Sequence, residues 1–147
     1  MKCNVLMNKA LKNANWSDIS LPQDLQELLE RGFIKNDGCM FLASVFKNKP
    51  DEERLIDKTG VECFINSIHI DDYIYERYLD YACLFCNQLL TTWNNGVWCK
   101  NGELNVIISL DEFGAVIKFH LKRKNEYWLN SNLEKYGEAI LETTHQL

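Results

Sequence analysis

The stretch Asp71–Gly96, DDYIYERYLDYACLFCNQLLTTWNNG, decides how the rest of this chain can fold. Its apolar residues recur three or four positions apart, so they share one face of an α-helix: Tyr75, Leu79, Ala82, Cys86, Leu89 and Trp93. Asp71 or Asp72 can cap the start, and Asn94-Asn95-Gly96 can end the helix. The middle of the stretch is apolar nearly all round, which predicts a long helix buried in the core.

Shorter elements are expected ahead of this helix. The spacing of apolar residues favours a helix in 2–15, and Pro22 suits the first turn of a second one that stops by Gly32. The apolar run 39–46, CMFLASVF, fits a helix or a buried strand, because periodicity cannot separate the two at this length; we favour the helix. The polar stretch 48–60 indicates a surface loop.

Two short sequence patterns predict helix starts. Thr59 with Glu62, and Ser131 with Glu134, have the spacing at which a hydroxyl and a carboxylate each satisfy a free amide at the first turn of a helix. We therefore expect a helix over 60–67 and a short one that is closed by Gly137.

After Gly96 the pattern changes to alternation, which is typical of strands. Asn101-Gly102 fits a two-residue hairpin turn, and 111–114 makes a second turn. The expected strands are 97–100, 104–110, 115–123 and 139–144. The order predicts an α+β fold in one domain, residues 1–147: N-terminal helices and one long buried helix packed on a C-terminal antiparallel sheet.

Composition narrows the classes of partner. The chain has 147 residues, 46% of them hydrophobic, and a net charge of −5. Nucleic acid and anionic membranes need a basic surface, so we expect neither as a partner and favour a basic protein. No uncharged apolar run of about 18 residues occurs, and Lys9 and Lys12 interrupt the N-terminal stretch, so we expect a cytoplasmic protein.

Cys83 and Cys86 have the CxxC spacing of redox pairs and of zinc half-sites. Redox chemistry needs the first cysteine at a helix N-terminus, whereas Cys83 falls inside the expected helix. Cys99 and His120 could complete a metal set through tertiary contact. We favour core packing for the cysteines, and expect no metal and no cofactor.

Three kinds of surface are candidates for binding. Asp72, Glu76 and Asp80 recur every four residues and would form an acidic stripe on the long helix. His120 alternates with Lys118 and Lys122, which predicts an isolated histidine on a solvated sheet face. Aromatic side chains near charges also suit an interface, although core packing is the default expectation for Trp93 and Trp128.

Two stretches, 59–73 and 109–141, resemble the small immunity proteins encoded beside bacterial contact-dependent growth-inhibition and related polymorphic toxins. The residues that carry the likeness are Glu62, Cys63, Phe64, Asn66, Phe119, His120, Arg123, Glu126, Trp128, Leu133, Tyr136 and Ile140. The resemblance implies a cytoplasmic protein that binds one cognate toxin domain, often a nuclease, and blocks it. An acidic inhibitor also associates rapidly with a basic target.

These observations predict a binding protein that catalyses no reaction. Its expected partner is the toxin domain, contacted through Asp72, Glu76, Asp80, His120, Arg123 and Glu126. The alternative is a small thiol- or metal-dependent protein that uses Cys83, Cys86, Cys99 and His120.

Overall fold

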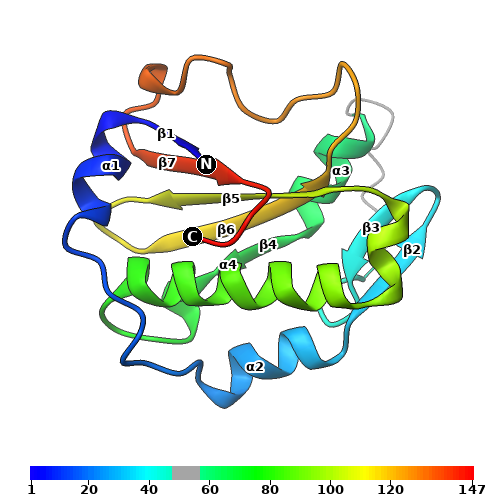
Figure 1. Cartoon of the computed structure of the whole chain (residues 1–147), viewed down its shortest axis with the longest axis horizontal. Helices are drawn as coiled ribbons and strands as arrows, with labels where there is room; N and C mark the ends of the chain where they lie inside the picture. The colour runs from blue at the N-terminus through cyan, green and yellow to red at the C-terminus, as the bar shows by residue number, and fades with distance from the viewer. Residues whose placement is uncertain (48–56) are drawn as a thin grey trace.

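The computed structural model describes residues 1–47 and 57–147 and is built around two antiparallel sheets (Figure 1). The strands of the larger sheet are β1 (Lys2–Cys3), β4 (Ser67–His69), β5 (Leu104–Leu110), β6 (Ala115–Leu121) and β7 (Ala139–Thr143). They lie in the order β1-β7-β5-β6-β4, with every neighbouring pair antiparallel. The smaller sheet pairs β2 (Phe33–Asn36) with β3 (Cys39–Leu42).

The helices are α1 (Val5–Leu11), α2 (Gln23–Glu30), α3 (Lys58–Ile65) and α4 (Tyr78–Asn95), and the 3-10 turns are η2 (Ile70–Asp72), η3 (Val97–Asn101) and η4 (Leu133–Lys135). The helix α4 packs on β5 and β6 and runs alongside these strands, and α2 packs on the side of α4 that faces away from the sheet (Figure 1). The helix α3 packs on β3 and β6. This arrangement confirms the predicted α+β fold with a long buried helix on an antiparallel sheet.

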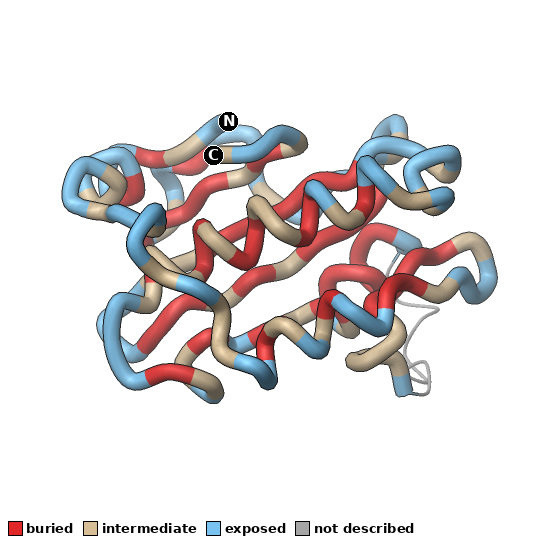
Figure 2. Tube along the Cα trace, turned by 60° about the horizontal axis from the view of Figure 1, so that its bottom comes forward, coloured by how far each residue is buried: buried red, intermediate tan, exposed pale blue. Residues whose placement is uncertain are grey.

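The main core lies between α4 and the larger sheet. The inward face of α4 is almost fully buried (Figure 2) and consists of Leu79, Ala82, Cys83, Phe85, Cys86, Leu89, Leu90 and Trp93. Alternate residues of β5 and β6, such as Val106 and Phe119, meet this face. Phe33 of the small sheet joins the same core through an edge contact with Trp93, 5.0 Å between ring centroids. The predicted alternation of side chains in β5 and β6 is confirmed, and it directs the other residues of these strands to the opposite face of the sheet, where the site described below lies.

The predicted start of the long helix was wrong. Residues 70–72 form η2, and Arg77, immediately before α4, has a left-handed backbone with φ of 58°. Because the chain turns there, neither Asp71 nor Asp72 caps the helix. Asp72, Glu76 and Asp80 consequently do not form a stripe on one helix face, since only Asp80 belongs to α4.

Other local predictions were also wrong. Residues 39–42 form β3 rather than a helix, and all four are buried. Residues 97–101 form η3 rather than a strand, so Asn101-Gly102 closes no hairpin; β5 instead pairs with β6 through the predicted turn at 111–114. The short edge strands β1 and β4 were not predicted.

The two capping patterns were misleading. Asp57, not Thr59, caps α3, and its carboxylate accepts from the Gly60 amide at 2.8 Å. Asn132, not Ser131, caps η4. Of the predicted surface loop 48–60, residues 48–56 lie outside the described residues.

Candidate functional site

A recess of about 700 Å³ lies on the face of the larger sheet that points away from α4. Residues of β5, β6 and β7 form its floor, the N-terminal Met1 and Lys2 lie at one side, and residues 122–131 line another. Strand alternation explains the floor. Asn105 and His120 are direct partners in the β5–β6 ladder, and Glu142 of β7 pairs with Ile107, two residues beyond Asn105 on the same face of β5.

Three side chains on the floor form a hydrogen-bonded chain. The Asn105 amide donates one N–H to Glu142 Oε2 at 3.0 Å and the other to His120 Nε2 at 3.2 Å. His120 Nδ1 lies 2.8 Å from the Leu121 carbonyl oxygen, which can only accept, so Nδ1 carries the proton and Nε2 is the acceptor. Asn105 thus links a carboxylate to an imidazole.

The structure corrects the prediction for His120. The side chain lies on the face opposite Phe119, as the alternation predicts, but the residue is only 5% exposed. Both ring nitrogens have partners within the protein. His120 is therefore a buried member of the recess floor rather than an isolated surface histidine.

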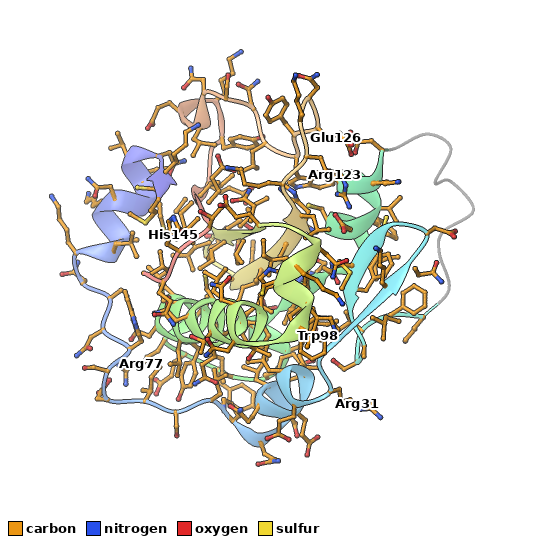
Figure 3. All side chains as sticks on the ribbon, turned by 45° about the vertical axis from the view of Figure 1, so that its right-hand side comes forward. Arg31, Arg77, Trp98, Arg123, Glu126 and His145 are labelled. Atoms are coloured by element: carbon orange, nitrogen blue, oxygen red, sulfur yellow. The ribbon has the colours of Figure 1, made fainter. Side chains whose placement is uncertain are left out.

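Arg123 and Glu126 lie together beside α3 (Figure 3), and both also border the recess. The Arg123 guanidinium donates to both carboxylate oxygens of Glu62, with 3.0 Å between Nη2 and Oε2. The Glu62 side chain is fully buried. Burial lowers the pKa of Arg123 and Glu62 raises it, with the net direction upward. Glu126 accepts from the Thr59 amide at 3.1 Å in the first turn of α3. Both predicted contact residues thus also have structural roles.

Glu62 connects several backbone segments. Its carboxylate accepts from the amides of Met40, at 2.7 Å, and Leu121, at 3.1 Å, in addition to its pair with Arg123. Asn66 adds donations to the Met40 and Phe119 carbonyls at 2.9 and 3.3 Å. The two stretches that carry the family resemblance therefore pack directly against each other.

The acidic residues predicted from the long helix lie elsewhere. The turn and loop that hold Asp72 and Glu76 are far from residues 122–131 (Figure 1), and Arg77 lies on the opposite side from Arg123 (Figure 3). Asp80 is paired with Arg77 at 2.8 Å and accepts from the Asn15 amide at 3.0 Å. Asp72 and Glu76 remain exposed. Of the six predicted contact residues, the structure brings only His120, Arg123 and Glu126 to one site.

Tyr127 and Trp128 form an aromatic rim of the recess; from the sequence, an interface role for Trp128 ranked behind core packing and Tyr127 was not considered. Tyr127 is 78% exposed and Trp128 is 40% exposed, although Trp128 was expected to pack in the core. The Lys118 ammonium lies 5.7 Å from the centroid of the Trp128 ring, a cation–π contact. The run Glu126-Tyr127-Trp128 after a strand, with aromatic residues next to charges, was the available signal.

The residues of the thiol or metal alternative do not converge. Cys83 and Cys86 are buried in the core, where burial raises the pKa of both thiols, that of Cys83 to about 12, while Cys99 is exposed. Within the described residues, no three or more His, Cys, Asp or Glu side chains are grouped so that they could hold a metal ion. No described helix is long and apolar enough to cross a membrane.

The fold and the recess define a small α+β protein with one sheet face sealed by a helix and the other hollowed over a polar floor. The chain belongs to the family described as Uncharacterized protein PM0498, whose model matches residues 2–146. It is 32% identical over 96 residues to "Uncharacterized protein PM0498" of Pasteurella multocida (strain Pm70). That similarity covers 59% of this chain and 58% of the relative's length. No solved structure matches the chain.

Proposed function

We propose that this protein is an immunity protein that binds a cognate toxin domain in the cytoplasm and neutralises it without a reaction of its own. The resemblance of 59–73 and 109–141 to immunity proteins of polymorphic toxins supports this function. The net charge of −5 favours a basic target, such as a nuclease domain, because opposite charges speed association.

One observation carries the proposal: Tyr127 and Trp128 stand exposed at the rim of a recess with a polar floor. Tyrosine and tryptophan dominate the binding energy of protein interfaces, especially beside a pocket that a partner side chain can fill. The segment just before the rim is anchored, because the Glu126 carboxylate accepts from the Thr59 amide and Arg123 pairs with Glu62. A preformed rim lowers the entropy cost of binding.

Co-expression with the toxin domain encoded next to this gene tests the function. We expect the toxin domain alone to arrest growth, this protein to restore growth, and the purified pair to form a stable complex in calorimetry. A growth arrest that this protein does not relieve would overturn the proposal.

Variants at the rim locate the interface. Replacing both Tyr127 and Trp128 by alanine should weaken toxin binding by about thirtyfold or more, since such residues cost at least about 2 kcal/mol when truncated. The matched control is Phe113→Ala, which removes a 76% exposed aromatic residue from the turn between β5 and β6 and should leave the affinity unchanged.

The exposed acidic residues are tested separately. Asp72→Lys combined with Glu76→Lys should slow association with a basic toxin and make the association rate less dependent on salt. Asp80 is left unchanged, because its pair with Arg77 supports the fold. Unchanged association kinetics would show that Asp72 and Glu76 are only solvated surface.

A further inference from the structure

The recess contains a hydrogen-bond acceptor that the protein itself does not use. Asn105 is only 7% exposed, and both of its N–H groups are committed, one to Glu142 and one to His120. No described group donates to its carbonyl oxygen. Since no buried side-chain polar atom of the described residues lacks a partner, this oxygen reaches open space, and the open space beside Asn105 is the recess.

A second acceptor lies next to it. Glu142 Oε2 is held by the Asn105 amide at 3.0 Å, while Oε1 has only the Lys2 ammonium at 3.8 Å. Lys2 is largely exposed, so this pair is weak. The floor thus presents an amide oxygen and a carboxylate side by side. Two neighbouring acceptors, one of them charged, bind a cationic group with several N–H donors best.

The other cationic side chains that line the recess already have partners. Glu62 holds Arg123, and Glu103 holds Lys122 at 3.3 Å. Lys2 alone lies on Glu142, so an ammonium already occupies the approach to the floor. At Glu142, an incoming cation therefore has to displace one weakly held lysine.

We propose that the recess receives an arginine side chain of the protein partner, with its guanidinium on Glu142 and the Asn105 oxygen. A planar fork of donors fits two neighbouring acceptors better than a lysine ammonium does. The aromatic rim of Tyr127 and Trp128 suits the apolar stem and the cationic plane of arginine. This inference rests on the proposed function and identifies the contact that anchors the basic partner.

Short peptides test the recess without the toxin. The probes are acetyl-Gly-Arg-Gly-amide and the same peptide with citrulline, which keeps the shape of arginine and loses its charge. We expect the arginine peptide to shift the Asn105 side-chain amide signal of the full-length protein saturably in nitrogen-15 correlation spectra. Citrulline should bind at least about tenfold more weakly, because it loses a charge-assisted hydrogen bond.

Two variants change the affinity in opposite directions. Glu142→Gln keeps an oxygen that accepts from Asn105 and removes the charge, so it should weaken arginine-peptide binding by about tenfold. Lys2→Ala removes the competitor and should strengthen binding by about two- to fivefold, the worth of an exposed ion pair. Glu112→Gln, in the turn between β5 and β6, is the control and should have no effect.

No saturable shift with the arginine peptide, or equal binding of citrulline, would overturn the arginine site. Weaker binding by Lys2→Ala would also contradict it. These outcomes leave growth rescue by the protein untouched, because the toxin could bind the rim through other groups. Growth rescue that fails while the peptides bind as expected would instead overturn the immunity function alone.

Discussion

The two faces of the larger sheet are built from alternate residues of the same strands and differ in kind. The face on α4 is apolar and sealed, and includes Leu104, Val106, Ile108, Ile117 and Phe119, each at most 1% exposed. The other face carries Asn105, His120 and Glu142, joined by hydrogen bonds at the floor of the recess, and Lys118, which donates to Ser67. The first face supplies the burial that stabilises the fold, and the second supplies oriented polar groups.

A binding role is expected on the polar face of the sheet rather than on the apolar face. Burying polar groups costs free energy unless each finds a partner, and an apolar face would avoid that cost altogether. Asn105 and His120 are buried nonetheless, and their N–H and ring nitrogen atoms are all satisfied. Polar groups kept where the fold does not need them are expected at functional sites.

Phe119→Ala should give the largest loss of stability, since the side chain is fully buried between α4 and the sheet. Removing it leaves a cavity, and the free energy of unfolding should fall by about 4 kcal/mol. Urea unfolding measures the change. Tyr127→Ala, on the recess rim, is the control and should stay within about 0.5 kcal/mol of the unmodified protein. Equal losses for the two variants would remove the contrast between the faces.

Glu62→Gln should lower the free energy of unfolding by slightly less, about 3 kcal/mol, because it leaves the half-buried Arg123 without its counter-charge. This variant sharpens the comparison, since Glu62 is a polar group near the recess whose role is structural. Urea unfolding again gives the value. The matched control is Lys122→Gln, which breaks the exposed pair with Glu103 and should cost less than about 1 kcal/mol. A small effect of Glu62→Gln would mean that Arg123 is free to bind a partner.

His120→Ala should destabilise by about 1–2 kcal/mol, less than Phe119→Ala at the neighbouring position of the same strand. The loss comes from the Asn105 N–H and the Leu121 carbonyl, which lose their partner. Because the recess is open to water, solvent can replace the missing imidazole in part. A loss as large as that of Phe119→Ala would show that the polar face carries the fold as much as the apolar face does.

The parts of the fold that sequence could predict depend on local patterns. Alternation in 104–110 and 115–121 and the turn between them gave the central hairpin, and 3.6-residue spacing gave most of α4. The run 39–42 was misassigned because all four residues are buried, so no alternation marks a strand. The edge strands β1 and β4 are too short for a pattern, and they form by pairing with β7 and β6, which are distant in sequence.

The candidate site was less predictable, because its residues meet through tertiary contact. Glu62 fitted a capping pattern with Thr59, but its partner Arg123 lies 61 residues away. His120 looked solvated by alternation alone, since nothing in its own strand reveals Asn105 or the segment 122–131. The acidic stripe failed because a left-handed residue, Arg77, precedes α4, and such a turn leaves no periodic signal.

Replacing Lys118 should have the smallest effect on stability, and the pH dependence of that effect tests how far the polar face of the sheet is desolvated. Desolvation lowers the pKa of Lys118 below its usual 10.5, and the nearby Cys63 opposes this only in part. Between the lowered pKa of the folded state and 10.5, the unfolded chain binds more protons than the folded protein. Lys118 therefore makes the free energy of unfolding rise with pH.

The variant Lys118→Met removes that contribution. The stability difference, unmodified protein minus Lys118→Met, should therefore increase from neutral pH towards 10.5. Urea unfolding across this range measures the difference, and a difference that is flat or falls would mean that the Lys118 ammonium remains as well solvated as one on the open surface.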